Sequence, residues 1–354
     1  MRWEKLNDNC TFAFSPEAEP LFGVLCLLGG ETIDRYCTEL YGAEQIASWK
    51  RGYRFLFETY DAVRNLTHYD LLDFLLDVLG PDFTLDRFRD YVLSLPEGER
   101  VFRPVSWKYL CGASKADVVK AVEDDAALDA LYARLENKCS GFLGFSSFIR
   151  QSSRFFQEFF ALAAEMDTPA LRDALRARSG EIESFRLRVI DSLRDSDALE
   201  ASQQLMGKTF YNRGPYERFC FMPSLLAPFR ALRYFYANNT PHNRQILVCR
   251  ILEPEKSCAD TLAALKVLSD ETRYRILMFL AEQGPAKGQD IARMLKLTPS
   301  TVSHHMVELR ERGLVTEEPV RTAKFYGISG KAVKELLCAV AKDMKLDFPG
   351  NRKK

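Results

Sequence analysis

Along most of the chain, apolar residues recur at steps of three and four, a spacing typical of amphipathic helices. This periodicity predicts helices over residues 31–67, 69–79, 85–95, 114–138, 141–166 and 170–202, with a loop over residues 96–105. The apolar run at residues 21–30 is about half of the ~20 residues that span a bilayer, so we interpret it as a buried helix. Two short runs of β-forming residues, 218–222 and 245–251, predict a small β element after these helices.

The pattern changes after residue 252. A polar joint at residues 253–257 leads to helices predicted at 259–268, 273–282 and 289–295, and then to a further helix that starts at Pro299. Strands predicted at 314–318 and 324–329 form a β-hairpin, and a helix over 330–344 closes the segment. The predicted fold is mainly α. A mostly helical sensor or dimerisation domain with a small β element occupies residues 1–252, and an α+β winged helix-turn-helix domain occupies residues 258–346.

The helix that starts at Pro299 has the layout of a DNA recognition helix. Thr298 can cap it, and Val302, Met306 and Leu309 predict a buried stripe. Short polar side chains crowd the opposite face near the N-terminus, where free N–H groups and the helix dipole favour phosphate. The predicted DNA-binding residues are Thr298, Ser300, Thr301, Ser303, His304, His305 and Arg310 on this helix, and Arg321 and Lys324 on the hairpin, or wing.

Linked motifs in this segment resemble those of the ArsR family of bacterial regulators. They are Leu265-x-x-Leu268-Ser-Asp-x-Thr-Arg-x-Arg-Ile-Leu277, Ser300-Thr-Val-Ser-His-His305 and Leu309-Arg-x-x-Gly-Leu-Val315. The resemblance implies a homodimer, formed through the helices that flank the module, which binds an imperfect inverted repeat in double-stranded DNA and usually represses transcription. The metal-sensing members carry a paired-cysteine box before the turn, whereas residues 285–292 contain no cysteine. We therefore expect no metal and no cofactor.

Charge and cysteine usage refine this picture. The net charge of the 354-residue chain is zero, yet residues 258–354 hold 17 Lys and Arg against 12 Asp and Glu. A basic segment behind an acidic body is typical of a phosphate-binding module joined to a separate domain. The nine cysteines stand at irregular spacings, which indicates reduced thiols. Because the first residues lack the apolar core of a signal peptide, we expect a cytoplasmic protein that does not bind membranes.

Three functions are compatible with these features. The favoured one is a bacterial DNA-binding repressor whose N-terminal domain senses an unknown small-molecule effector or adds dimer contacts. The alternatives are a signal- or ligand-responsive protein-interaction module and an enzyme with an appended regulatory winged helix. No catalytic triad, metal-binding helix or dinucleotide fingerprint occurs, so we do not expect an enzyme. The phenylalanine-rich stretch at residues 142–160 could line an effector pocket, but helical spacing of aromatic residues favours a core.

Overall fold

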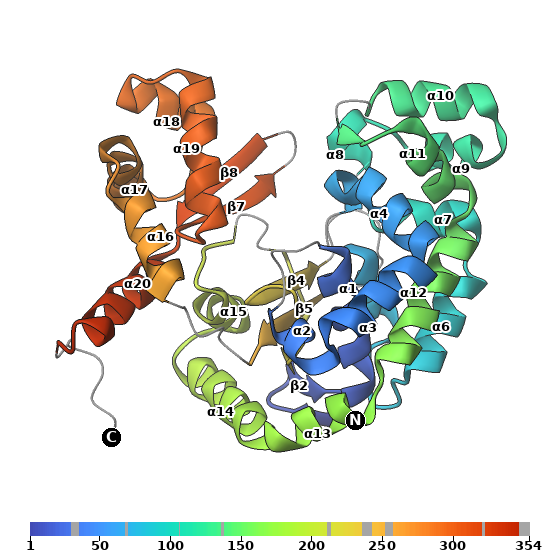
Figure 1. The fold of residues 1–354 in the computed structure, drawn as a ribbon, viewed down its shortest axis with the longest axis horizontal. Helices are drawn as coiled ribbons and strands as arrows, with labels where there is room; N and C mark the ends of the chain where they lie inside the picture. Colours follow the sequence, from blue (N-terminus) through green and yellow to red (C-terminus); the bar gives the residue numbers. More distant parts are fainter. Residues whose placement is uncertain are drawn as a thin grey trace. The chain divides into compact units, whose positions relative to one another are not determined.

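The computed structural model of the chain forms two compact units (Figure 1). It describes residues 1–29, 35–67, 70–105, 107–135, 138–210, 214–235, 243–251, 258–320 and 323–346. The first unit comprises Met1–Ala201 and Gly214–Glu253, and the second comprises Ser202–Arg213 and Pro254–Lys354. The border after Glu253 falls at the start of the polar joint, which lies outside the described residues. The second unit also includes residues 202–213, which were predicted to belong to the first domain.

Helices make up most of the first unit, as predicted. They are α1 (Glu19–Leu28), α2 (Arg35–Tyr41), α3 (Ala43–Gly52), α4 (Arg54–Thr67), α5 (Leu75–Val78), α6 (Leu85–Ser94), α7 (Glu97–Phe102), α8 (Trp107–Cys111), α9 (Lys115–Glu123), α10 (Asp125–Ala133), α11 (Phe142–Arg150), α12 (Ser152–Met166), α13 (Pro169–Ala177) and α14 (Ser179–Asp195), with 3-10 turns at Pro16–Ala18 and Asp70–Leu72. A border between the units falls within α15 (Ala198–Met206), after Ala201. Several long predicted helices are divided. Asp124, for example, ends α9 and caps α10 by accepting a hydrogen bond from the backbone N–H of Ala127.

The predicted loop at residues 96–105 is wrong, because it contains α7. Pro96 precedes the helix, and Glu97 and Glu99 lie in its first turn, where acidic side chains interact favourably with the helix dipole. The side chain of Arg100 is buried and donates hydrogen bonds to the carbonyl oxygens of Leu93 and Leu95. Tertiary contacts therefore stabilise a helix that is too short to be recognised from periodicity.

The β element is larger than predicted. It consists of β1 (Arg2–Lys5), β2 (Cys10–Phe14), β3 (Arg218–Ser224), β4 (Ala231–Phe235) and β5 (Arg244–Arg250). These strands form one sheet in the order β1-β2-β3-β5-β4, in which β2, β3 and β5 are parallel and the edge strands β1 and β4 are antiparallel to their neighbours. The sheet thus joins the first residues of the chain to the last strands of the unit.

Both faces of this sheet are buried, which explains the near-continuous apolar character of β3 and β5. Met222 and Val248 belong to the main hydrophobic core of the unit. On the opposite face, the ring of Phe12 lies 6.5 Å from that of Phe185 on α14, which packs against β3. The sheet is therefore a central layer and not an exposed appendage.

The phenylalanine-rich stretch forms core. Six of its rings are buried, and only Phe142 at the start of α11 is substantially exposed, at 41%. Every residue of α1 is buried, and α1 packs against α12. The buried helix predicted at residues 21–30 is therefore confirmed over its described part. Among the described residues, no helix combines the length and apolar character that a membrane crossing requires.

The second unit follows the predicted winged-helix order closely. Its elements are α16 (Cys258–Leu268), α17 (Glu271–Gln283), β6 (Ala286–Lys287), α18 (Gly288–Leu295), α19 (Pro299–Glu311), β7 (Val315–Val320), β8 (Ala323–Ile328) and α20 (Gly330–Asp343). The strands form an antiparallel sheet in the order β6-β8-β7, and the unit has a hydrophobic core of its own. Gly313 links α19 to the wing at φ +68°, a backbone conformation that strongly favours glycine.

Candidate DNA-binding site

A tight turn joins α18 to α19 and fixes the angle between them. Lys296 adopts the left-handed conformation, at φ 56°, and the backbone N–H of Leu297 donates to the carbonyl of Ala292 at 2.9 Å. Ile291 and Ala292 are buried, but Met294 is 61% exposed. Successive residues of a helix are rotated by about 100°. A buried side that includes Ala292 is therefore turned away from Met294.

The recognition helix α19 is capped as predicted. The hydroxyl oxygen of Thr298 accepts a hydrogen bond from the backbone N–H of Thr301 at 3.1 Å, and Pro299 occupies the first turn. The predicted buried stripe is confirmed, because Val302, Met306 and Leu309 are at most 1% exposed. The cap and the stripe together hold one face of α19 toward solvent.

That solvent face is narrower than predicted. Ser300, Ser303 and His304 are exposed, whereas Thr301 is half-buried and its hydroxyl lies 2.7 Å from that of Thr298. Val307 is 39% exposed. The positions 300, 303, 304 and 307 have the spacing of one helix face, which we call the reading face. Sequence reasoning missed Val307 because it sought only polar groups, although an apolar side chain can contact the methyl group of thymine.

His305 does not belong to the reading face. Its side chain is only 14% exposed, and its Nδ1 lies 4.0 Å from Oδ1 of Asp270, at the start of α17. Burial lowers the pKa of His305 below its usual value, which favours the neutral imidazole. The prediction that His305 lies on the exposed face of α19 is therefore wrong: it packs toward the helix that precedes the helix-turn-helix.

Two of the predicted DNA-binding cations share one acid. Arg310 on α19 and Lys324 on β8 both contact the carboxylate of Glu317 on β7, at 3.1 Å and 2.8 Å. The Glu317 side chain is 19% exposed, whereas those of Arg310 and Lys324 are 46% and 59% exposed. The structure thus brings together two predicted DNA-binding residues around an acid that no sequence motif had singled out. The other predicted wing cation, Arg321, lies outside the described residues.

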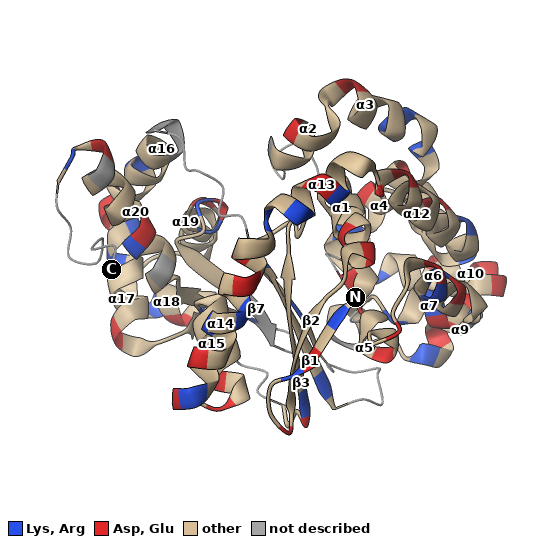
Figure 2. Ribbon diagram, turned by 90° about the horizontal axis from the view of Figure 1, so that it is seen from below, with Lys and Arg blue, Asp and Glu red and all other residues tan. Residues whose placement is uncertain are grey.

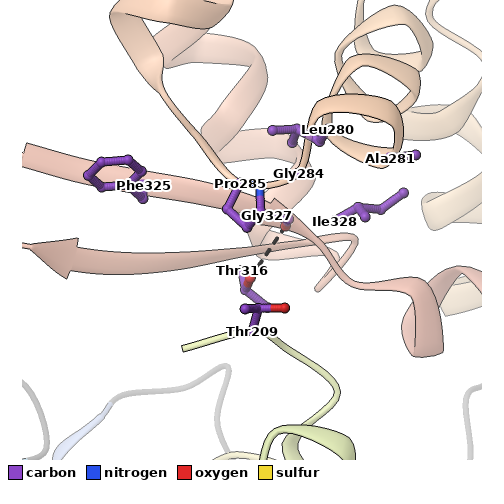
Figure 3. Close-up of a pocket in the computed structure, with 9 residues that line it drawn as sticks. All are labelled: Thr209, Leu280, Ala281, Gly284, Pro285, Thr316, Phe325, Gly327 and Ile328. Carbon is purple, nitrogen blue, oxygen red and sulfur yellow. Dashed lines mark hydrogen bonds between the residues drawn. The ribbon is translucent and has the colours of Figure 1, made fainter. Parts of the chain in front are cut away.

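A small cavity of about 210 Å³ is lined by residues of β7 and β8 and by the end of α17 (Figure 3). Its lining includes Pro285, Thr316, Gly327 and Thr209, and none of its nine lining residues has an ionisable side chain. The hydroxyl of Thr316 donates to the carbonyl of Gly327 at 3.3 Å, as the dashed line in Figure 3 shows. This cavity lacks the acidic and basic side chains that proton-transfer chemistry requires.

A larger cavity, of about 400 Å³, lies in the first unit beside α5 and α6. Asp77 lines it and accepts hydrogen bonds from the Tyr91 hydroxyl at 2.8 Å and from Arg103 at 2.8 Å. Arg87 at the same cavity pairs with Asp82. Sequence reasoning named no such cluster, because these residues come from separate elements and match no motif. Its charged groups are engaged with one another.

Figure 2 shows acidic residues on α10 and both acidic and basic residues on α9 of the first unit.

The second unit combines a capped recognition helix with an antiparallel wing, which defines a winged helix-turn-helix module of the kind that binds DNA. The model of the bacterial regulatory protein arsR family matches residues 270–317, from the cap of α17 into β7. The transcriptional activator HlyU of Vibrio cholerae is 30% identical over 102 residues, which cover 29% of this chain and 87% of HlyU. The chain belongs to the ArsR family of bacterial regulatory proteins.

Other relatives are also transcriptional regulators. A cadmium resistance transcriptional regulatory protein CadC homolog of Staphylococcus aureus is 28% identical over 78 residues, which cover 22% of this chain and 64% of that protein. The solved structure of HlyU from Vibrio cholerae has 28% identity and a TM-score of 0.22, and the similarity covers 25% of this chain and 95% of that one. The family match lies within the second unit and leaves the first unit uncovered.

Proposed function

We propose that this regulator binds an inverted-repeat operator in double-stranded DNA as a homodimer and represses transcription. The observation that carries the proposal is the reading face of α19, where a buried stripe and the Thr298 cap leave Ser300, Ser303 and His304 exposed. Hydroxyl and imidazole groups can hydrogen-bond to base edges in the major groove, and Val307 can contact a thymine methyl group. Arg310, Arg321 and Lys324 would contact phosphates and hold the helix in register.

The proposed dimer forms through α16 and α20, the helices that flank the module. The two helices pack against each other, and both leave apolar side chains exposed. On α20, Leu337 is 42% exposed and Met344, just beyond its end, is 63% exposed, while Leu262 on α16 is 54% exposed. Residues 337 and 344 are seven apart and lie on the same side of the helix. A second copy of the chain would remove this apolar surface from water.

The proposal assigns sensing, and no catalysis, to the first unit. An effector bound there would regulate by favouring a dimer geometry in which the two recognition helices no longer fit successive major grooves. The cavity of about 400 Å³ beside α5 and α6 is a space in the first unit that could admit a small molecule. The proposal places the protein in the cytoplasm and needs no metal or cofactor. Because its relative HlyU is a transcriptional activator, the sign of regulation is part of the test.

The DNA contacts can be tested by fluorescence anisotropy with operator and mixed-sequence duplexes. Affinity should fall steeply as salt rises from about 50 to about 200 mM, because phosphate contacts release counterions. Replacing Ser303 and His304 by Ala should weaken operator binding by about 1–3 kcal/mol for each lost base contact. Binding to the mixed-sequence duplex should change much less. Equal losses on both duplexes would place these side chains on the backbone and would contradict the assignment of the reading face.

The dimer can be tested by sedimentation analysis of Leu337→Glu, with Leu143→Glu as the matched control. Leu143 is 81% exposed on α11 of the first unit, so a charge there should leave the association unchanged. We expect Leu337→Glu to give a monomer that binds a single half-site weakly. A Leu337→Glu protein that remains dimeric would rule out the proposed interface. Transcription from an operator-controlled reporter then decides between repression and activation.

A further inference from the structure

Glu317 has a position that the DNA-binding role of the wing does not require. It is the one acid whose carboxylate contacts both Arg310 and Lys324 in the described part of the chain, with its Oε2 3.1 Å from Arg310 and its Oε1 2.8 Å from Lys324. The two cations come from different elements, α19 and β8, and Glu317 lies between them on β7. The acid is largely covered, whereas both cations remain open to solvent. Their exposure is what a phosphate contact needs.

This arrangement reduces the positive charge that the wing can offer to DNA. Two cations and one carboxylate within ion-pair distance have a net charge of one. A phosphate that approaches Arg310 or Lys324 must compete with a carboxylate that already occupies the same donors. It must also approach the negative charge of Glu317 itself, because the carboxylate lies between the two cations. Like charges at such distances repel each other and oppose close binding.

We propose that Glu317 is an internal competitor that limits how strongly the wing holds the DNA backbone. This inference rests on the proposed function, since it presupposes that Arg310 and Lys324 face phosphate. The competitor suppresses binding that is independent of sequence, because phosphate contacts supply most of that binding. Contacts of the reading face are unaffected, so base contacts make up a larger share of the operator affinity with Glu317 than without it. Glu317 thus limits the part of the affinity that carries no sequence information, although it touches no base.

The size of the effect follows from counterion release. Each additional phosphate contact contributes a slope of about −0.9 to the dependence of log K on log salt. If Glu317→Gln adds one contact for each wing, mixed-sequence binding should tighten, for each bound wing, roughly eightfold at about 0.1 M salt and roughly fourfold at about 0.2 M. The salt dependence should steepen by about 0.9 for each bound wing, and by twice that for a dimer with both wings on DNA.

The experiment measures the binding of the full chain to a mixed-sequence duplex about three helical turns long. Glu317→Gln keeps the shape and the hydrogen-bonding oxygen while removing the charge. The matched control is Glu311→Gln, which removes the same charge from the exposed end of α19. Within the described residues, Glu311 forms no ion pair. The control should tighten binding by less than about twofold and leave the slope unchanged, since bulk charge is screened over about 10 Å.

A double-mutant cycle separates competition from a general charge effect. Lys324→Gln should weaken binding less in the wild-type protein than in the Glu317→Gln variant, because Glu317 already occupies that cation in the wild type. In the Glu317→Gln background, the same substitution should remove most of the gain. Thermal unfolding of each variant verifies that it is folded. Weaker DNA binding by Glu317→Gln would show that the acid orients the cations and would overturn the inference, as would a gain equal to that of the control. A wild-type protein that binds no duplex at all would instead refute the proposed function.

Discussion

A buried carboxyl group in the first unit leads to a quantitative prediction about stability. Glu19 at the start of α1 is fully buried, and its Oε2 accepts hydrogen bonds from the Ser224 hydroxyl and from the backbone N–H groups of Leu225 and Leu226, each at 3.0 Å. These hydrogen bonds connect the start of α1 to the end of β3 and to the two residues that follow it. Burial nevertheless outweighs them and raises the pKa of Glu19 from 4.5 to about 7.

The direction of the pH dependence follows from this shift. Below about pH 4.5 the carboxyl group is protonated in both the folded and the unfolded chain, and its contribution to stability is greatest. As the pH rises from about 4.5 to about 7, the unfolded chain releases the proton first, so the free energy of unfolding decreases. Above about pH 7 both forms are ionised and the loss is constant. At 1.36 kcal/mol for each pH unit, the loss amounts to about 3 kcal/mol.

The perturbation is Glu19→Gln, which has nearly the same shape and does not titrate. Urea unfolding can be followed by tryptophan fluorescence, because the three tryptophans, Trp3, Trp49 and Trp107, all lie in the first unit. The free energy of unfolding of the wild-type protein minus that of the variant should decrease by about 3 kcal/mol between about pH 4.5 and about pH 7.5. The subtraction removes the contributions of all other titrating groups.

Glu44→Gln is the control, because Glu44 is exposed on α3. Its difference from the wild type should change by less than about 0.5 kcal/mol over the same range. Parallel curves for the wild type and Glu19→Gln would show that the buried carboxyl group titrates normally. A difference that increases with pH would mean that the hydrogen bonds to the carboxylate outweigh burial, which would reverse the reasoning.

Three further predictions concern the DNA-binding unit. Thr298→Ala removes the hydroxyl that accepts a hydrogen bond from the backbone N–H of Thr301. It should destabilise α19 by about 1 kcal/mol, as measured by amide hydrogen exchange. Thr298→Ser should restore the protection of α19 from exchange. Met306→Ala, at a site 1% exposed, should cost about 2–5 kcal/mol in chemical unfolding followed by circular dichroism. Because burial lowers the pKa of His305, its contribution to stability should be present above about pH 6.5 and decrease as the pH falls. His305→Gln should abolish that decrease in stability. A pKa of 6.5 or above for His305, measured by NMR titration, would contradict the prediction.

The winged helix could be predicted from sequence because its signals are local. The side chain of Asp270 caps α17 by accepting a hydrogen bond from the backbone N–H of Arg273, three residues later. Thr298 caps α19 through the backbone N–H of Thr301, at the same spacing. Gly313 ends α19 with a positive φ, and the buried stripe repeats at helical spacing. Each of these features is contained within one or two turns of chain. Their order along the sequence therefore determines the order of the elements.

The sheet of the first unit could not be predicted in the same way. Cys10 on β2 pairs with Phe219 on β3, more than 200 residues away. Neither β1 nor β2 is long enough to show a clear alternation, and both owe their conformation to neighbours that are distant in sequence. The Glu317 ion pairs have the same origin, because Arg310 and Lys324 meet only when the wing folds back beside α19. Such contacts depend on tertiary structure, which periodicity does not encode.

Charge pairing on the DNA-binding unit bears on how the regulator could respond to a signal. Besides the Glu317 pairs, Arg293 on α18 pairs with Asp290 at 2.6 Å. Paired cations such as Arg293, Arg310 and Lys324 gain less from phosphate contacts than unpaired cations would, so the affinity depends more on base contacts at both half-sites. If an effector displaces one recognition helix from its groove, the base contacts of that half-site are lost together. For the proposed dimer, we therefore expect a modest change in geometry to release the protein from the proposed operator, whereas a strongly cationic winged helix would remain bound to DNA through its phosphate contacts.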